Sequence, residues 1–306
     1  MIDRPPLPLT LVGGYLGSGK TTLVNHLLRH AGGMRFAILV NEFGSLSIDS
    51  DLIEAESDTM ISLAGGCVCC SYGNDMMLAL TEIDRLQPRP DHIILEASGV
   101  ALPGAIASTL SLVQTIDLEG ILVLVDAANI RDQAENVYVG DTVRRQIQDA
   151  DILLVNKIDL VSPAERGALH EWLRSLNGAA GLIDAEHGKI DLSAVLGHRL
   201  HASNRIRRAA VAHSVPFETV ALAFDRPVDP AHLGRQLTLN HPEIVRAKGF
   251  VDAPDGRRWT LHVVGGRWQV SEAPPCVQAQ FVVIGIGPLN VDMLCRRLGG
   301  RLPIEN

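Results

Sequence analysis

Hydrophobic residues in the first two thirds of the chain alternate between short continuous runs and longer stretches with helical spacing. The runs are rich in β-branched residues, as buried strands are, and the stretches between them place apolar residues three and four positions apart. This pattern predicts strands at 8–13, 36–41, 91–96, 120–126 and 151–156. It predicts helices at 19–30, 74–87, 141–149 and 163–176. Strands separated by helices of this size favour the α/β class, with a mostly parallel sheet covered on both faces.

The pattern changes near residue 185, where a polar, weakly patterned stretch typical of a linker begins. Beyond it we expect a strand at 215–224, a helix at 229–239, strands near 243–252, 258–264 and 279–285, and a helix at 288–298. The segments "RRWTL" and "GGRWQV" look like the strands of a hairpin. This order favours a smaller α+β domain with helices over one face of an antiparallel sheet. The predicted organisation is a first domain at 1–185, a linker at 186–212 and a second domain at 213–306.

Composition narrows the classes of protein to consider. The 306 residues are 46% hydrophobic and 20% charged, which is ordinary for a folded protein. A net charge of −8 argues against a nucleic-acid partner, because nucleic-acid binders usually carry a basic stripe. The apolar runs are strand-length, well short of the roughly 18 residues of a membrane span, and the N-terminus lacks the pattern of a secretory signal. We therefore expect a cytoplasmic protein that binds neither nucleic acid nor membrane.

The stretch "GYLGSGKTT" fits the P-loop pattern, with a predicted strand before it and an amphipathic helix after it. Glycines let consecutive backbone N–H groups curl around phosphate oxygens, and the helix N-terminus adds its positive end. Lys20 would reach the β- and γ-phosphates, and the Thr21 hydroxyl would bind Mg²⁺. The predicted nucleotide-binding residues of this stretch are Gly14, Gly17, Ser18, Gly19, Lys20, Thr21 and Thr22. A chance glycine-rich turn would not supply the strand, the helix and every fixed position together.

Two acids are candidates for the surroundings of Mg²⁺ and the γ-phosphate. Glu96 ends the apolar strand of "IILEASG", the layout of a Walker-B element, which places it at the carboxyl end of the sheet. Asp49, in "NEFGSLSID", falls between the P-loop and that strand, where segments that respond to the γ-phosphate are found. Asp49 is a candidate outer-shell partner of Mg²⁺. Lys20, Glu96 and Asp49 are the predicted catalytic residues.

The stretch "VNKID" follows a further apolar strand and gives the pattern N-K-x-D in Asn156, Lys157 and Asp159. A carboxylate such as that of Asp159 can accept two parallel hydrogen bonds, from N1–H and from the exocyclic amino group of guanine. Adenine offers no such pair and would leave the acid without partners, at a cost that discriminates strongly against ATP. The predicted nucleotide is therefore GTP, bound in part by these three residues.

Three of the five cysteines lie within "GGCVCC", as Cys67, Cys69 and Cys70. Thiolates favour soft cations such as Zn²⁺, Cu⁺ or Co²⁺, and three ligands from one loop leave a coordination position open for loading and release. The alternatives are a group of reduced, buried cysteines or a redox pair, although C-x-C-C lacks the usual C-x-x-C spacing. Four histidines near the linker could also bind metal, although scattered surface histidines are commoner: His187, His198, His201 and His213.

With these elements in this order, the chain resembles the CobW-like family of metallochaperone GTPases, relatives of the nickel-insertion GTPases that serve urease and hydrogenase. The resemblance is carried by "GYLGSGKTT", "NEFGSLSID", "GGCVCC", "LEASG" and "NKID", and in the second domain by "FDRPVDPAHL" and "RAKGF". It implies a P-loop GTPase domain, a CobW C-terminal-like domain, and GTP hydrolysis coupled to delivery of zinc or cobalt to a client metalloprotein. It also implies a transition-metal site at Cys67, Cys69 and Cys70, and a Mg²⁺ site served by Thr21, Asp49 and Glu96.

The chain departs from the family pattern near the cysteines. Many members carry glutamate at the positions held here by Ser45 and Ser62, and many have a long histidine-rich insert that is reduced here to scattered histidines. Glu42 remains as an oxygen ligand for the transition metal. These differences bear on which metal is bound and how tightly, and not on the GTPase assignment.

The resulting hypothesis is a slow GTPase switch. With GTP and Mg²⁺ bound, residues 41–70 are ordered and hold the metal, and hydrolysis relaxes them so that the metal passes to the client. No arginine finger or water-positioning glutamine stands out, so we expect a client or a homodimer partner to complete the site. A metal sensor or buffer with little turnover is the alternative, and a P-loop kinase is disfavoured by N-K-x-D and by the cysteines.

Overall fold

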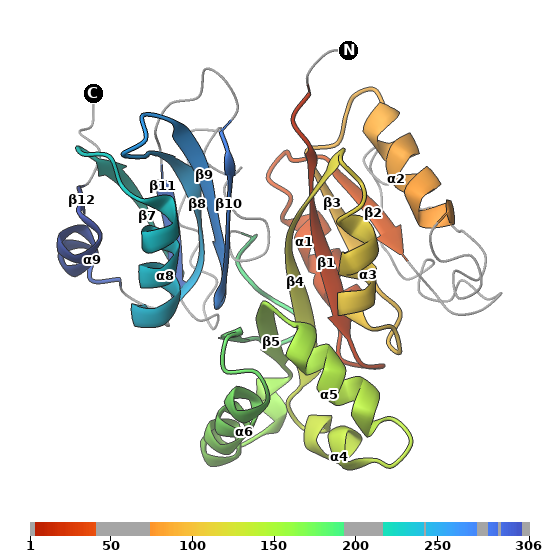
Figure 1. The fold of residues 1–306 in the computed structure, drawn as a ribbon. Coiled ribbons are helices and arrows are strands. Elements are labelled where there is room, and N and C mark those ends of the chain that lie inside the picture. Colours follow the sequence, from red (N-terminus) through yellow and green to blue (C-terminus); the bar gives the residue numbers. More distant parts are fainter. Residues whose placement is uncertain are drawn as a thin grey trace.

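The computed structural model describes residues 4–40, 74–192, 217–241, 243–273, 281–286 and 289–301. These residues form two domains that lie side by side, each built on its own β-sheet (Figure 1). The first sheet is parallel and the second antiparallel, as the two hydrophobic patterns predict. Among the described residues, no helix is both long and apolar enough to cross a membrane.

The first sheet has the strand order β2-β3-β1-β4-β5-β6, and every neighbouring pair is parallel. Its strands are β1 (Leu7–Gly14), β2 (Phe36–Val40), β3 (His92–Glu96), β4 (Ile116–Asp126), β5 (Ile152–Asn156) and β6 (Gly181–Asp184). The first five confirm the strands predicted from the apolar runs, and β6 is an additional strand. Every residue of β1, β3 and β5 is buried, which explains why these strands are continuous apolar runs rather than alternating ones.

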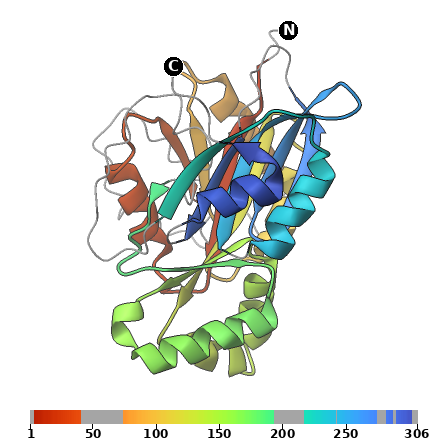
Figure 2. The ribbon, with the colours of Figure 1, turned by 90° about the vertical axis from the view of Figure 1, so that its left-hand side faces the viewer.

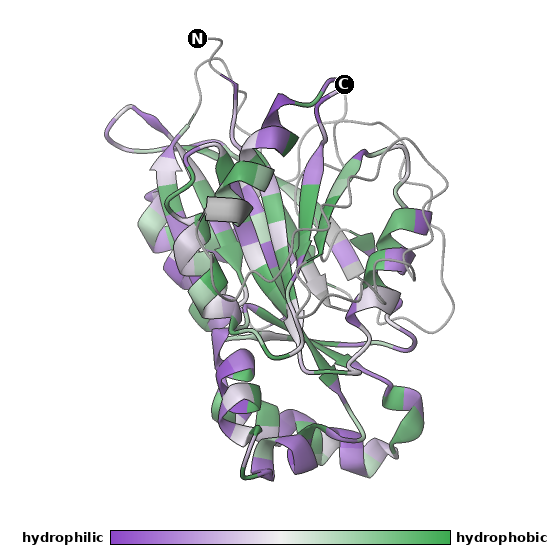
Figure 3. Ribbon diagram, turned by 90° about the vertical axis from the view of Figure 1, so that its right-hand side faces the viewer, coloured by the Kyte–Doolittle hydropathy of each residue, from purple (hydrophilic) through white to green (hydrophobic). Residues whose placement is uncertain are grey.

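Helices cover one face of this sheet almost completely. The helices of the domain are α1 (Lys20–Arg29), α2 (Asn74–Arg85), α3 (Pro103–Leu110), α4 (Ile130–Glu135), α5 (Gly140–Asp149) and α6 (Pro163–Leu176), with a short 3₁₀ helix at Ile158–Leu160. All of the α-helices except α1 share one hydrophobic core with the sheet. The helices at the lower end of Figure 3 alternate between hydrophobic and hydrophilic residues, as helices with one buried face do.

The opposite face is covered by α1 and by the second domain. Leu23 and Leu27 of α1 share a core with Val245, Val264 and Ile284 of the second sheet. The predicted parallel sheet covered on both faces is therefore confirmed, with one cover supplied by the neighbouring domain. This arrangement is visible from the side in Figure 2, where the second sheet lies in front of the first.

The second sheet has the order β10-β9-β8-β11-β7-β12, and its pairs are antiparallel. Its strands are β7 (Phe217–Phe224), β8 (Ile244–Asp252), β9 (Arg258–Val264), β10 (Arg267–Glu272), β11 (Phe281–Ile286) and β12 (Gly300–Arg301). Strands β9 and β10 form the predicted hairpin. Helices α8 (Pro230–Asn240) and α9 (Val291–Leu298) share a core on one side of the sheet. The prediction of an antiparallel sheet with helices over one face is confirmed.

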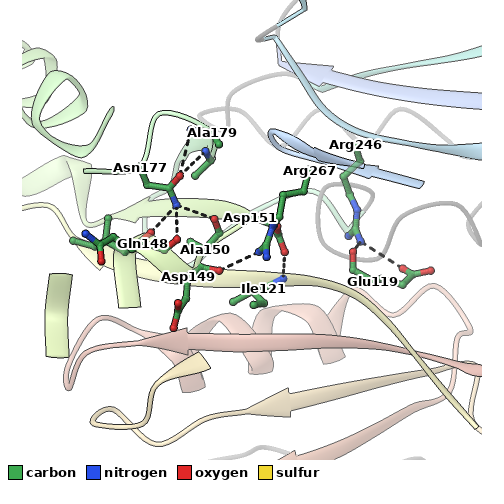
Figure 4. Close-up of polar contacts among 12 residues, drawn as sticks. Glu119, Ile121, Gln148, Asp149, Ala150, Asp151, Asn177, Ala179, Arg246 and Arg267 are labelled. Atoms are coloured by element: carbon green, nitrogen blue, oxygen red, sulfur yellow. Dashed lines mark hydrogen bonds and ion pairs between the residues drawn. The ribbon is translucent and has the colours of Figure 1, made fainter. Parts of the chain in front are cut away.

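Charged residues also join the two domains, at the end of the first sheet where β4 and β5 begin (Figure 4). The pairs are Lys248 with Glu119 (2.9 Å) and with Asp117 (3.2 Å), Arg246 with Glu119 (3.6 Å), and Arg267 with Asp151. The side chains of Arg246 and Glu119 are 3% and 1% exposed. Buried charges of opposite sign are tolerated when they are paired in this way.

Candidate functional site

The P-loop connects β1 to α1 at the carboxyl edge of the first sheet, the end at which ligands bind in open α/β sheets. Gly14, Gly17 and Gly19 all have positive φ, at 132°, 74° and 101°, a region that favours glycine. A Cβ atom at Gly19 would lie 2.4 Å from the side-chain amide nitrogen of Asn156, and one at Gly14 would lie 2.5 Å from the carbonyl oxygen of Leu124. Conformation therefore favours glycine at all three positions, and close packing favours it at Gly14 and Gly19 as well.

Lys20, the first residue of α1, is buried and folds back over this loop. Its Nζ donates hydrogen bonds to the carbonyl oxygens of Gly14 (3.0 Å) and Tyr15 (3.3 Å). These bonds hold a positive charge at the helix N-terminus, where the backbone N–H groups already favour anions. Ser18 is buried beside it, and Thr22 on the first turn of α1 is exposed.

The predicted Mg²⁺ residues Thr21 and Glu96 lie together. Strands β1 and β3 pair with Val12 opposite Glu96, which brings the end of β3 beside the P-loop. The Thr21 hydroxyl donates to Oε1 of Glu96 at 3.2 Å, and Glu96 is only 4% exposed. A hydroxyl and a carboxylate are hard oxygen donors, so this pair fits a Mg²⁺ ion. Asp49, the third residue predicted to serve Mg²⁺, lies outside the described residues.

The loop after Glu96 is packed against the P-loop. A Cβ atom at Gly99 would lie 2.9 Å from the backbone nitrogen of Leu16, so glycine is required for this close approach. Gln146 of α5 is buried and donates to the carbonyl oxygens of Gly99 (3.1 Å) and Ala101 (2.8 Å). This glutamine, which the sequence analysis did not single out, fixes the loop at the back of the site.

Asn156 of the N-K-x-D pattern ends β5 and is 2% exposed. Its side-chain amide donates to the carbonyl oxygen of Ser18 (2.9 Å), and its Oδ1 accepts from the N–H of Gly188 (2.9 Å). Both polar atoms of the side chain are thus used inside the protein. Asn156 ties the P-loop to the segment that follows β6.

Lys157 and Asp159 lie on the turn that follows. Lys157 has a φ of 62°, in the left-handed region, and its Nζ donates to Oδ2 of Asp126 at 2.7 Å. Asp159 belongs to the 3₁₀ helix Ile158–Leu160 and is exposed at the carboxyl edge. The P-loop, Glu96 and the N-K-x-D residues therefore come together along a single edge of the sheet.

Asp126, the last residue of β4, is a member of this site that the sequence analysis missed. It ends the run "ILVLVD" in the same way as Glu96 ends "IILE", and this layout could have identified it. Burial would raise the pKa of its carboxyl group, but the hydrogen bonds from Lys157 and Asn129 and the charge of Lys157 outweigh burial and lower that pKa. Asp126 is therefore a charged residue at the carboxyl edge of the sheet.

The predicted transition-metal residues Cys67, Cys69, Cys70 and Glu42 lie outside the described residues, as do Ser45 and Ser62. Of the four histidines near the linker, the structure describes His187. Within the described ranges, no group of three or more histidine, cysteine, aspartate or glutamate side chains could hold a metal ion.

Comparisons with known proteins identify the family of this chain. The family model described as "CobW/HypB/UreG, nucleotide-binding domain" matches residues 8–184, and that described as "Cobalamin synthesis protein cobW C-terminal domain" matches residues 217–301. The chain is 27% identical over 308 residues to the zinc chaperone CobW of Sinorhizobium sp, covering 87% of each chain. It is 31% identical over 265 residues to the zinc chaperone YjiA of Escherichia coli (strain K12), covering 80% of this chain and 82% of YjiA.

Among solved structures, a crystal structure of a Zn(II)-bound triple mutant of the YjiA GTPase matches 92% of this chain and 95% of its own, with 25% identity and a TM-score of 0.48.

Proposed function

The chain belongs to the CobW/HypB/UreG nucleotide-binding family, and we propose that it is a GTP-hydrolysing metallochaperone that delivers zinc or cobalt to a client metalloprotein. The observation that carries the nucleotide half of this proposal is the contact between the Thr21 hydroxyl and Glu96 at 3.2 Å, beside Lys20. The metal half is supported by the three cysteines of "GGCVCC" and by the zinc chaperones among the relatives.

The residues of the carboxyl edge have distinct roles in this proposal. Lys20 and the N–H groups of the P-loop bind the phosphates, and Asp159 accepts the two hydrogen bonds that distinguish guanine. Thr21 and Glu96, with Asp49, would hold Mg²⁺, which when bound neutralises the charge that develops on the β- and γ-phosphates. Asn156 keeps the P-loop and the base-recognition turn in register through its two hydrogen bonds.

The transported metal is a substrate of this protein rather than a resident cofactor. Cys67, Cys69 and Cys70, with Glu42, are its proposed ligands, and a thiolate site of this kind requires the reducing conditions of the cytoplasm. Hydrolysis of GTP to GDP and phosphate would then change the segment between the P-loop and Glu96, and so release the metal. We propose that the client, or a second copy of the chain, completes the site for hydrolysis.

Multiple-turnover release of phosphate from GTP tests the enzymatic half of this function. We expect slow turnover, well below the ~1 s⁻¹ of assisted GTPases, and acceleration when Zn²⁺ or a client is added. The Lys20→Ala variant is the control and should release no phosphate above background. Purified protein that binds GTP but never completes one turnover, with or without metal, would instead be a nucleotide-modulated sensor or buffer.

A triple Cys→Ser variant at positions 67, 69 and 70 tests the metal half. Loading the wild-type protein with Co²⁺ should give the thiolate-to-metal charge-transfer absorption expected of cysteine ligands, and the variant should lose it. A variant at Cys295, a half-buried thiol that packs against the core of the second domain, is the matched control and should keep the band. Full absorption in the triple variant would place the metal elsewhere.

A further inference from the structure

The carboxylate of Asp126 is almost surrounded by donors. Its Oδ1 accepts from the backbone N–H of Ala128 (3.1 Å), and its Oδ2 accepts from the side-chain amide of Asn129 (3.1 Å) and from Nζ of Lys157 (2.7 Å). Asp126 is 3% exposed. The bonds from Ala128 and Asn129 hold the Asp126 carboxylate in place within its own turn. The bond from Lys157 therefore fixes the position of the lysine, and the carboxylate does not depend on the lysine for its own position.

Asp126 reaches Lys157 because their strands end together. Strands β4 and β5 are parallel and pair with Asp126 opposite Asn156, and the N–H of Ala127 donates to the carbonyl oxygen of Asn156 at 2.9 Å. Lys157 is the first residue after β5. Asp126, the last residue of β4, therefore holds Lys157.

The backbone of Lys157 needs such support. A left-handed conformation is uncommon for a residue other than glycine, and it persists where the surrounding structure fixes it. It allows three nearby side chains to point in different directions: Asn156 inward to the P-loop, Lys157 toward β4, and Asp159 outward at the edge of the sheet. Without the ion pair, the turn between Asn156 and Asp159 would lose its side-chain anchor to β4 and keep its backbone hydrogen bonds, such as that from the N–H of Leu160 to the carbonyl oxygen of Lys157 (3.0 Å).

We propose that Asp126 is a positioning residue for guanine recognition: by holding Lys157, it fixes the turn that presents Asp159 to the base. This inference rests on the proposed binding of GTP. In this role Asp126 itself does not touch the nucleotide. It acts on the affinity for the base and not on the chemistry at the γ-phosphate, which lies with Lys20, Thr21 and Glu96.

Inosine triphosphate provides a sensitive probe of this role. Inosine keeps the N1–H of guanine but lacks its exocyclic amino group, so ITP can form only one of the two hydrogen bonds that Asp159 accepts from GTP. The ratio of GTP affinity to ITP affinity therefore reports how well Asp159 is aligned with the base. A general loss of stability would weaken both nucleotides together and leave this ratio unchanged.

The test uses the full-length chain and its Asp126→Asn variant. Asparagine keeps the size of the side chain and the bond to Ala128, but removes the charge that holds Lys157. We expect the Kd for GTP to rise about tenfold and the preference for GTP over ITP to fall by a similar factor, because a hydrogen bond to a charged group is lost. The rate of phosphate release at saturating GTP should change by less than about threefold, since the transition-state contacts are intact.

Two further variants separate positioning from stability. Asn129→Ala removes an exposed side chain whose role is to steady Asp126, and should shift the affinity for GTP and the GTP-to-ITP ratio in the same direction as Asp126→Asn, by about twofold.

Asp84→Asn is the matched control, because it breaks another ion pair: Asp84 accepts from Nε of Arg89 at 3.0 Å in a partly buried site. Arg89 also donates to the carbonyl oxygen of Pro5, just before β1, so this control lies at the amino ends of the strands, away from the carboxyl ends where Asp126 lies.

A wild-type protein that prefers GTP, with an Asp126→Asn variant of unchanged Kd and unchanged GTP-to-ITP ratio, would overturn the positioning role and leave the proposed function standing. A lowered rate at saturating GTP with both binding values unchanged would also overturn it. A wild-type protein with no preference for GTP over ITP or ATP would instead remove the guanine assignment and this inference with it. If Asp126→Asn fails to fold, the Asn129→Ala ratio decides between these outcomes.

Discussion

Strands β4 and β5 carry charged residues at both ends, and the two ends use them differently. At the amino ends, Glu119 and Asp151 pair with Arg246, Lys248 and Arg267, all of which belong to the second domain. At the carboxyl ends, Asp126 pairs with Lys157 of its own domain, and Asp159 is exposed. Glu119 and Arg246 at the amino ends are thus enclosed between two domains, whereas at the carboxyl ends Asp126 is buried within its own domain and Asp159 is exposed.

We expect the charges at the two ends of these strands to serve different purposes: those at the amino ends contribute to the stability of the fold, and those at the carboxyl ends to ligand binding. Burial would raise the pKa of Glu119, but the positive charges of Lys248 and Arg246 outweigh it and lower that pKa from 4.5 to about 2. Such a group stabilises the folded state because its charge is matched within the protein. A residue such as Asp159, which forms no such pair across domains, is available to a ligand. Substitutions at the amino ends should therefore affect folding, and those at the carboxyl ends should affect nucleotide affinity.

Glu119→Gln should cause the largest effect and break the domain interface. Removing the carboxylate takes away the largest of the negative charges that act on the buried guanidinium of Arg246, which costs about 3–5 kcal/mol of unfolding free energy. Urea unfolding measures this loss. Asp117→Asn is the control, because the Asp117 side chain is 46% exposed and its pair with Lys248 contributes about 0–1 kcal/mol. Equal losses in the two variants would contradict the comparison.

The same pair predicts a specific acid dependence. Because the folded pKa of Glu119, about 2, lies below the ordinary value of 4.5, its stabilisation is complete above pH 4.5 and is lost as the pH falls toward 2. The total is about 3 kcal/mol. The gap in unfolding free energy between wild type and Glu119→Gln should therefore narrow steadily as urea unfolding is repeated below pH 4.5. A gap that stays constant down to pH 3 would show that Glu119 is not held charged by its partners.

Lys20→Ala tests the other end of the sheet. Loss of the ammonium at the P-loop should weaken GTP binding at least ~100-fold, or about 2.7 kcal/mol, while the unfolding free energy changes by less than about 1 kcal/mol. Calorimetric titration and urea unfolding of the same preparation give both values. Unchanged GTP affinity would refute the P-loop assignment, and a large loss of stability would remove the contrast between the two ends.

Asp159→Asn should have the smallest effect, which should be on the preference for GTP over ATP and not on the stability of the fold. Replacing one acceptor oxygen by an amide group removes one of the two hydrogen bonds to guanine, which should lower the preference for GTP over ATP by about tenfold. Competition binding with the two nucleotides measures this preference. A variant as selective as wild type would mean that another residue recognises the base.

Local patterns in the sequence predicted the parts of this structure that depend on neighbouring residues. The five long strands of the first domain and the N-K-x-D turn are continuous segments with strong signals. Helix α4 and strand β6 have only six and four residues, too few for a periodic pattern to appear. Helix α3 is short and largely apolar, so its spacing gives little contrast between a buried and an exposed side.

Contacts between distant residues could not be predicted in the same way. Arg246 donates to the backbone carbonyl oxygen of Glu119, 127 positions away, and pairs with its carboxylate at 3.6 Å, but a single sequence offers many acids as equally good ion-pair partners. The bond between Asn156 and Gly188 depends on the loop after β6, which the sequence pattern did not distinguish from a linker. Asp126 differs, because its place at the end of an apolar strand was visible, but its partner Lys157 becomes clear only when β4 and β5 are adjacent.

We propose that the carboxyl edge binds a guanine nucleotide whose γ-phosphate controls a thiolate metal site. Calorimetric titration of Zn²⁺ into the full-length protein, loaded with a non-hydrolysable GTP analogue or with GDP, tests this coupling most directly. We predict tighter Zn²⁺ binding in the triphosphate form, by a factor in the range of ~5–150, with the same factor for tightening of the nucleotide by Zn²⁺. Equal Zn²⁺ affinities in the two forms would contradict it.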